Sequence, residues 1–424
     1  MPAPSPLPRK TSAAGSLPIA EQAAPVDQAE LASLVRKAYD DSTPIYPIGG
    51  GTSLDFGLAP KLPGLGLSLT GLDQVVDYPW QDMTVTVEAG VTMDTLARTL
   101  AAERQCLPID AAQPAEATIG GMVATNFSGP RRYGCGTLRD YVIGINAVDG
   151  RGTAFKGGGR VVKNVAGYDF CRLLTGSLGS LAVISQVTLK VKPLSEASAF
   201  LTCEAADLDR AEQLLAALVQ SSTTPTAIEL LCGPAWQESE ELRLSPAAAA
   251  RLLVGLEGTR AEVDWMLEQL SHEWHSAGVE AFQTLRDEAA SRAWRRLIDF
   301  AAPGDSPLVV KANVKPSAVT AMIALFRGVD PGCSIQAHAG NGIVLARFAE
   351  FSSGDVSRVL IGRLRPAAVA AGGNLVVWSA QGVGDLTRQA VWGAISEAPV
   401  VEAVKRQFDP RGLLNPGRFV YGTN

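Results

Sequence analysis

Glycine is concentrated in a few short segments of this chain, and these segments constrain the fold more than any other feature. The chain has 424 residues, 42 of them glycine, and the clusters fall at residues 49–51, 120–121, 157–159 and 176–179. Glycine accepts backbone conformations that other residues rarely adopt, and it lets a ligand approach the main chain closely. The clusters therefore predict loops whose main chain, rather than whose side chains, lines a binding site.

Composition excludes several classes of protein. The formal net charge is −6, whereas a nucleic-acid-binding protein usually carries a basic excess. No apolar run reaches the ~18 residues of a membrane-spanning helix, and the N-terminus lacks the pattern of a secretory signal. The chain has only 3 His, and its 6 Cys form no CxxC pair, which argues against zinc and iron–sulfur sites. Scattered single thiols favour a reducing, cytoplasmic compartment.

The length and the change of texture after Pro193 predict more than one domain. Residues 1–26 are rich in Pro, Ala and Ser and are expected to be a flexible tail. We assign residues 27–195 to a first domain and residues 196–400 to a cap domain. The turn-rich C-terminal segment, residues 401–424, is expected to return to the first domain.

Hydrophobic periodicity predicts an α+β protein. In the first domain it predicts helices over 27–39 and 93–103, the latter capped at Thr92, and strands over 45–48, 84–88, 142–148 and 181–191. In the cap it predicts strands over 200–203, 227–231, 252–256, 308–314, 334–338, 343–348 and 375–379, and helices over 208–219, 261–275, 318–326 and 356–371. The same order of strand, helix, strand, strand and helix occurs twice, which predicts an antiparallel sheet with helices on one face.

The first glycine segment, residues 47–54, is suited to an anion such as a pyrophosphate. Successive N–H groups at Gly49, Gly50 and Gly51 can converge on one point, and the hydroxyls of Thr52 and Ser53 add donors. The alternative is a simple tight turn. The segment is neither a Walker loop, since no Lys-Ser/Thr follows, nor a Rossmann fingerprint, since the spacing is not G-x-G-x-x-G.

Two further segments suit a flat or phosphate-bearing ligand. The pair Gly120 and Gly121 lies among the small residues Ala124, Thr125 and Ser128. Residues 157–184 place Lys163, Asn164 and Tyr168 between glycine turns. For both segments, the alternative is an ordinary packed or solvated loop.

These segments resemble the FAD-binding domain of the p-cresol methylhydroxylase/vanillyl-alcohol oxidase family. The resemblance lies in Thr118-Ile119-Gly120-Gly121, in Gly167-Tyr168-Asp169, in Gly176-Ser177-Leu178-Gly179 and in the closing Asn415-Pro416-Gly417. It covers about residues 30–195 and the C-terminus. Within the family, the run from Arg160 to Asp169 most resembles the FAD-binding subunits of bacterial glycolate oxidases, also called glycolate dehydrogenases.

The resemblance implies a two-part FAD-binding domain with an antiparallel-sheet cap, and it implies where FAD binds. The loop from residue 48 to residue 53 would hold the pyrophosphate, and the later segments would line the flavin and its ribityl chain. The implied FAD contacts are Ile48, Gly49, Gly50, Gly51, Thr52, Ser53, Pro114, Thr118, Gly120, Gly121, Thr125, Ser128, Gly129, Val183, Ile184 and Asn415.

The sequence departs from the family at the points of covalent FAD attachment. Many members attach FAD through a His at the position of Thr52, or through a Cys in the second segment. Thr52 cannot form that bond, and Cys135 is more simply explained as a small buried residue. We therefore predict non-covalent FAD.

A second departure concerns metal. Relatives that oxidise 2-hydroxy acids carry His-x-Gly-Asp-Gly-x-x-His, whose two histidines help to bind a metal. Here Asn341 replaces the acid and Leu345 the second His, while His272 and His275 lie on a predicted helix of amphipathic character. We predict no metal site. His338 is then the best available base or substrate-orienting residue, unless it only packs at a strand end.

Three cations, Arg131, Arg132 and Lys163, are candidates to bind a substrate carboxylate, although solvated surface positions explain them equally. Our leading hypothesis is an FAD-binding subunit of a multi-subunit dehydrogenase that oxidises glycolate or another 2-hydroxy acid. It would work in the cytoplasm with a second FAD-binding catalytic subunit and an iron–sulfur subunit, and would reach the inner membrane only through them. The alternatives are a self-sufficient FAD-linked oxidoreductase for another hydroxy acid or alcohol, and an assembly subunit without turnover.

Overall fold

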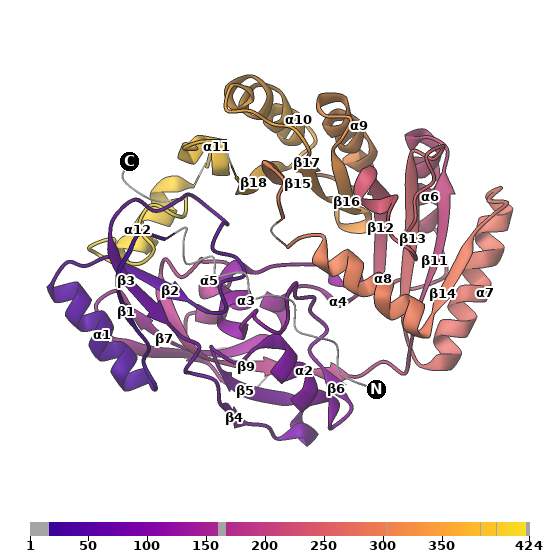
Figure 1. Ribbon diagram of the computed structural model, residues 1–424. Helices are drawn as coiled ribbons and strands as arrows, with labels where there is room; N and C mark the ends of the chain where they lie inside the picture. Colours follow the sequence, from indigo (N-terminus) through magenta and orange to yellow (C-terminus); the bar gives the residue numbers. More distant parts are fainter. Residues whose placement is uncertain (1–16, 160–166, 303, 382, 396, 421–424) are drawn as a thin grey trace, which may run out of the picture.

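The computed structural model describes residues 17–159, 167–302, 304–381, 383–395 and 397–420. Two bodies are visible in Figure 1: a first domain, which the C-terminal segment rejoins, and a cap built around one large sheet. The predicted tail lies partly outside the described residues, and Lys163 lies outside them.

The first domain begins with a three-stranded parallel sheet in the order β1-β3-β2. Its elements are β1 (Ile19–Ala23), α1 (Gln28–Asp40), β2 (Ile45–Ile48) and β3 (Gly64–Ser68). The predicted tail of residues 1–26 is therefore too long, because β1 pairs with β3. The sequence of β1 has no apolar alternation, so hydropathy does not predict it. Its main-chain hydrogen bonds to β3 define the strand.

A five-stranded antiparallel sheet in the order β4-β5-β9-β7-β8 forms the rest of the first domain. Its strands are β4 (Val75–Asp77), β5 (Thr84–Glu88), β7 (Val142–Asp149), β8 (Ala154–Gly158) and β9 (Ala182–Lys190). The helices are α2 (Met93–Ala101), α3 (Ile119–Thr125), α4 (Arg132–Cys135) and α5 (Phe170–Leu174), and the short strands β6 (Gln105–Cys106) and β10 (Lys192–Pro193) pair with each other. As predicted, the Thr92 side chain caps α2, by accepting the N–H of Thr95.

The cap sheet has eight antiparallel strands in the order β14-β11-β13-β12-β16-β17-β15-β18. They are β11 (Ala197–Ala205), β12 (Ala227–Cys232), β13 (Ala250–Gly258), β14 (Gln283–Arg286), β15 (Leu308–Asn313), β16 (Ser334–His338), β17 (Ile343–Phe348) and β18 (Asn374–Ala380). Each half has the strand order 4-1-3-2 of a split βαβ unit, and the two second strands, β12 and β16, join the halves. The predicted double occurrence is thus confirmed.

The sequence predicted that all cap helices lie on one face of the sheet, but one helix, α8 (Asp287–Asp299), lies on the other face (Figure 1). Helices α6 (Leu208–Leu218), α9 (Val319–Val329) and α10 (Arg365–Ala370) lie on the side away from the first domain, and α7 (Arg260–Ser276) packs on β11 and β13 (Figure 1). Helix α8 lies on the side facing the first domain. Its Trp294 donates to the Ser198 hydroxyl at 2.7 Å and packs on Phe200. The predicted helix over 356–371 begins as π-helix (Val356–Leu364) and continues as α10.

After β18 the chain forms α11 (Arg388–Trp392) and α12 (Ala398–Phe408) and runs back over the first domain. There the N–H of Ile45 donates to Leu413 at 2.8 Å, and the N–H of Asn415 donates to Ile45 at 2.8 Å. The C-terminal segment thereby extends the sheet edge at β2, close to the first glycine segment.

Candidate functional site

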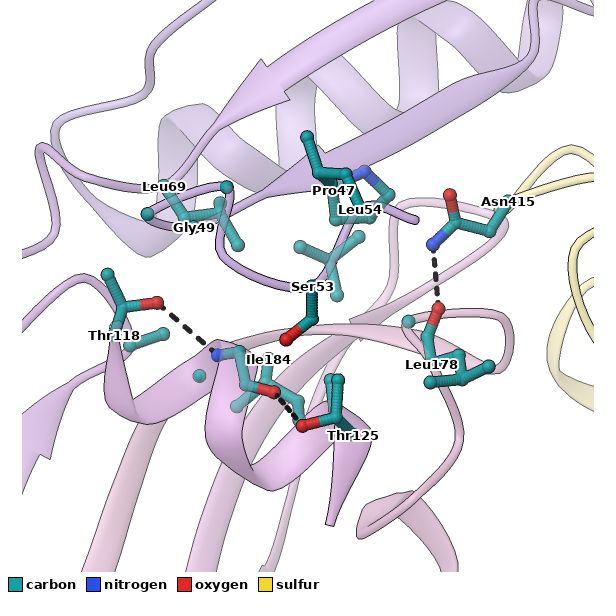
Figure 2. Close-up of a pocket in the computed structure, with 18 of the residues that line it drawn as sticks. Pro47, Gly49, Ser53, Leu54, Leu69, Thr118, Thr125, Leu178, Ile184 and Asn415 are labelled. Atoms are coloured by element: carbon teal, nitrogen blue, oxygen red, sulfur yellow. Dashed lines mark hydrogen bonds between the residues drawn. The ribbon is translucent and has the colours of Figure 1, made fainter. Parts of the chain in front are cut away.

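A cleft of about 810 Å³ lies between the loop after β2, helix α3, the loop before β9 and the C-terminal segment. Figure 2 shows these four segments converging, although they are far apart in the sequence. We call it the glycine-lined cleft. Of the residues singled out from the sequence, it is lined by Gly49, Gly50, Gly51, Thr52, Ser53, Thr118, Gly120, Gly121, Thr125, Val183, Ile184 and Asn415.

Four residues implied by the resemblance lie elsewhere. Ile48 is the last residue of β2 and does not line the cleft, and Pro114 is exposed, with its carbonyl accepting the N–H of Asp94. Ser128 and Gly129 line a second, smaller hollow of about 170 Å³. Arg132 lines that hollow too, so these residues sit on the cap side of α3 rather than along the main cleft.

Unused main-chain donors distinguish the first glycine segment. Among the described residues, none of the five N–H groups from Gly49 to Ser53 donates a hydrogen bond. Gly51 has φ of +78°, which favours glycine, and a Cβ there would meet only Leu54, at 3.9 Å. Consecutive free N–H groups in a glycine turn make an anion-binding concavity.

Gly50 has a different role, since it lets two segments touch. A Cβ at Gly50 would lie 1.6 Å from the carbonyl oxygen of Glu116, which no side chain could tolerate. The loop after β2 can therefore press against residues 116–118 only because glycine occupies this position. The first two sequence motifs meet for this reason.

Helix α3 forms the floor of the cleft (Figure 2). The Thr118 hydroxyl accepts the N–H of Gly121 at 3.3 Å, and the Thr125 hydroxyl donates to the Gly121 carbonyl at 2.9 Å. A Cβ at Gly120 would lie 2.8 Å from the Cβ of Ala89, so Gly120 serves close packing as well as lining the cleft. Both glycines of the pair lie in helix α3 rather than in a loop.

The far wall of the cleft is a strained loop held by the C-terminal segment. Leu178 has φ of +52° and Gly179 has φ of +62°, both in the left-handed region. Asn415 donates from Nδ2 to the Leu178 carbonyl at 2.7 Å (Figure 2). Asn415 therefore fixes the loop that closes the cleft, a role that needs the tertiary fold.

Arg418 is a residue of the cleft that the sequence analysis missed. Its side chain is buried and donates to the carbonyls of Leu54 and Phe56 at 2.6 and 2.8 Å. Burial lowers the pKa of its guanidinium to about 10. Of the described residues that line the cleft, it alone carries a charged side chain. It directly follows the closing motif Asn415-Pro416-Gly417, but no local pattern shows that its side chain turns inward.

The donors of the cleft fit FAD. A pyrophosphate needs several N–H donors and a compensating positive charge, and Gly49–Ser53 with Arg418 offer both. The remaining walls, which include Ala124 and Val183, are small or apolar and suit the ring and its chain.

Neither thiol near this region is suited to attach a flavin. Cys135 is in α4 and Cys106 in β6, and neither lines the cleft. Burial raises the pKa of both thiols, that of Cys106 to about 11, which keeps them protonated and poorly nucleophilic at neutral pH.

The cap presents buried polar groups toward the first domain. At the junction of β12 and β16, Glu229 and His338 are paired in register and almost fully buried. Glu229 accepts from His338 Nδ1 at 2.7 Å and from Gln336 Nε2 at 2.7 Å, while His338 Nε2 has no partner among the described atoms. Burial raises the pKa of the Glu229 carboxyl. We call the sheet face carrying these residues the cap face.

Glu229 was also missed, although a single acid inside the apolar strand Ala227–Cys232 is a usable signal. No group of three His, Cys, Asp or Glu able to hold a metal occurs among the described residues. Leu345 lies in register with Gln336 on the cap face, so an apolar side chain occupies the position of the second histidine. His272 and His275 are exposed on α7.

Arg131 is not available to bind a substrate carboxylate, because it already binds two. It pairs with Asp110 at 2.5 Å and with Glu257 of β13 at 2.8 Å, and its guanidinium lies 4.0 Å from the Trp294 ring. Arg131 thus joins the first domain to the cap, and the expectation of a solvated or substrate-binding position is wrong. Lys163 lies outside the described residues.

The chain belongs to the FAD-linked oxidase family. The model of the C-terminal domain of FAD-linked oxidases matches residues 194–419, more than half of the chain, and the FAD-binding domain model matches residues 21–158. These matches confirm the predicted family resemblance, the FAD-binding domain and the α+β class.

Several named proteins are similar over most of the chain. Glycolate oxidase subunit GlcD of Bacillus subtilis is 26% identical, covering 93% of this chain and 87% of that protein. D-lactate dehydrogenase of Archaeoglobus fulgidus is 26% identical, with 93% and 90% covered. Glycolate oxidase subunit GlcE of Escherichia coli is 34% identical over a shorter region, 53% of this chain and 63% of that protein.

The fold is shared with alkyldihydroxyacetonephosphate synthase, with a TM-score of 0.66, 16% identity, and 93% of this chain and 75% of that chain covered. The described helices include none that is both long and apolar enough to span a bilayer.

Proposed function

We propose that this chain binds FAD non-covalently in the glycine-lined cleft and oxidises the CH–OH group of a small 2-hydroxy acid, glycolate in the first instance, as one subunit of a larger dehydrogenase. The observation that carries the proposal is the set of five N–H groups at Gly49–Ser53 that donate to no described residue and line the same cleft as Arg418, a donor set for a pyrophosphate. Similarity to glycolate oxidase and D-lactate dehydrogenase proteins supports the reaction class.

Bound FAD would supply the two-electron acceptor, taking a hydride from the carbinol carbon of the substrate. The chain must supply a base for the hydroxyl proton, and His338 is our candidate, with Nε2 as the accepting atom. Because Glu229 accepts from Nδ1, that nitrogen carries the hydrogen and Nε2 keeps its lone pair. Glu229 is then a positioning residue that also stabilises the protonated imidazole.

Non-covalent binding is tested by acid precipitation of the purified yellow protein. We expect the flavin to remain in the supernatant, since neither Thr52 nor Cys135 offers a reactive group beside the ring. Flavin colour in the washed pellet would contradict this expectation.

The path that electrons must take after they leave the flavin indicates which partner subunits the chain needs. The chain has no CxxC spacing for an iron–sulfur cluster, so electrons bound for a distant acceptor need another subunit. We propose a second FAD-binding subunit and an iron–sulfur subunit in the cytoplasm, with the membrane reached through them. Similarity to the glycolate oxidase subunits of two organisms supports this assembly.

The second candidate is a self-sufficient dehydrogenase for another hydroxy acid, which the near full-length similarity to D-lactate dehydrogenase favours. Anaerobic mixing of the purified, FAD-loaded chain with glycolate or D-lactate separates the two. Flavin bleaching by the chain alone supports direct oxidation. Bleaching only after partner subunits are added supports electron relay, and no bleaching under either condition refutes the proposed reaction.

A further inference from the structure

Lys311 lies on the cap face, near the residues proposed for catalysis. In β15 it is in register with Leu345 of β17, which is in register with Gln336 of β16. Directly opposed residues of antiparallel strands project to the same face, and so do residues two apart. Lys311 therefore shares the cap face with Gln336 and His338.

The ammonium group of Lys311 has no anionic partner. Among the described residues, no carboxylate lies within ion-pairing distance, and its one recorded contact is with the Trp378 ring, 5.7 Å away. Burial and, to a smaller extent, the charge of Arg132 lower the pKa of Lys311 to about 8. An unpaired ammonium in such a position is costly, which points to an anion that binds it.

Arg132 is a second cation that forms no ion pair with a carboxylate of the described residues. It extends from α4 of the first domain, donates from Nη1 to the Ser128 hydroxyl at 2.9 Å and lines the smaller hollow. Burial lowers the pKa of its guanidinium as well. Phe127 lines the same hollow as Arg132 and packs against Trp378, with ring centroids 5.8 Å apart, and Trp378 borders Lys311. The fold thus brings two like charges from different domains to the two sides of this aromatic pair, which is unfavourable unless an anion lies near them.

Two aromatic rings separate Lys311 from the glycine-lined cleft. Phe56 lines the cleft and stacks on Trp378 of β18, with ring centroids 4.2 Å apart, and Trp378 in turn borders Lys311. On the same face, Gln336 Oε1 and His338 Nε2 are buried without partners. A ligand here could meet two positive charges and two unused polar atoms.

We propose that Lys311 and Arg132 bind the carboxylate of a small 2-hydroxy acid between the two domains, forming an anion site that needs no metal. A lysine point charge and the planar arginine fork can share one carboxylate. The identity of the substrate rests on the proposed function, whereas the anion site rests on the arrangement of the two cations.

The test uses oxalate, a small carboxylate without a carbinol hydrogen, so that binding is separated from turnover. The FAD-loaded chain is titrated with oxalate in a calorimeter, with and without EDTA. We expect oxalate to bind with the same affinity in the presence and absence of EDTA. Lys311→Met and Arg132→Gln should each weaken this binding at least about tenfold. Lys61→Gln, a matched removal of an exposed lysine paired with Asp385 on the surface, should bind like the parent.

Unchanged oxalate affinity in Lys311→Met, or loss of binding on adding EDTA, overturns the proposal. Far-ultraviolet circular dichroism and FAD content establish that each variant is folded, and Lys311→Arg, which keeps the charge, should retain measurable binding. If oxalate binds as expected but no hydroxy acid reduces the flavin, the anion site stands and the proposed reaction fails.

Discussion

The glycine-lined cleft and the cap face meet at Trp378, yet they are built in opposite ways. The cleft is made of main-chain donors and small side chains, with Arg418 as the only charge among the described residues that line it. The cap face carries the buried ionisable side chains Glu229 and His338 and the partly buried Lys311, on the middle strands of a sheet. A cofactor site of the first kind depends on backbone shape, whereas a reaction site of the second kind depends on charges held away from water.

This contrast predicts different responses to substitution. A change in the cleft should weaken FAD binding while leaving the chain folded. A change on the cap face should alter stability first, since the buried groups there are strongly coupled to their surroundings. Four substitutions test the contrast, in order of decreasing effect.

Glu229→Ala should have the largest effect, a loss of about 3–5 kcal/mol in the free energy of unfolding, because it leaves His338 and Gln336 buried without their acceptor. Denaturant unfolding of the purified chain measures it. Glu229→Gln keeps the volume and one acceptor and should lose far less. Equal losses in both variants would show that the carboxylate and its hydrogen bonds, and not the lost side-chain volume, are responsible.

Gly51→Val should weaken FAD binding at least about 100-fold, since the side chain enters the cleft and φ of +78° strains it. Quenching of FAD fluorescence on binding gives the affinity. The matched control is Gly412→Val, which imposes similar strain at φ of +68° with open space around it and away from the cleft. An equal loss of FAD binding in the control would show that strain alone accounts for the effect.

Lys311→Met should stabilise the chain by about 1–3 kcal/mol at neutral pH, because it removes an unpaired buried charge but keeps the apolar stem. The folded-state pKa of about 8 lies below the ordinary value of 10.5, so the cost of the charge is full below pH 8. It shrinks as the pH rises toward 10.5, where the lysine is neutral in both states. Unfolding measured at about pH 7 and again at about pH 10 should show the advantage shrinking; a constant difference would contradict this explanation.

Thr118→Ala should have the smallest effect, about 1 kcal/mol of stability, because it removes the hydroxyl that accepts the Gly121 N–H at the start of α3. Thermal unfolding measures the loss. Thr118→Ser retains the hydroxyl and should behave like the parent, whereas a full loss in that variant would place the effect in the methyl group.

Much of the fold could be predicted because its signals are local. Alternating apolar residues marked the strands of both domains, and the repeated order of elements predicted the cap sheet. Strand β1 could not be predicted in this way, because its sequence carries no pattern and its partner β3 lies forty residues further along the chain. Helix α8 is a different case, because its buried residues Ala290, Ala293, Trp294 and Leu297 recur at helical spacing and were a usable local signal.

The candidate cofactor residues were predictable to the extent that glycine conformation is a local property. Gly51 needs its positive φ in any context, and Gly50 needs the absence of a Cβ once its loop meets Glu116. Arg418 needed the three-dimensional structure, because nothing in its neighbourhood along the chain says that its guanidinium turns inward to Leu54 and Phe56.

The sequence by itself determined the family resemblance, the glycine turns and the missing second histidine at Leu345. Only the tertiary structure decided which charges are paired: Arg131 is held by Asp110 and Glu257, whereas Arg132 and Lys311 pair with no carboxylate in the part of the chain that the structure describes. The physical reason is that backbone preference acts within a few residues. The state of a charge depends on the groups that folding brings around it and on the water that folding removes.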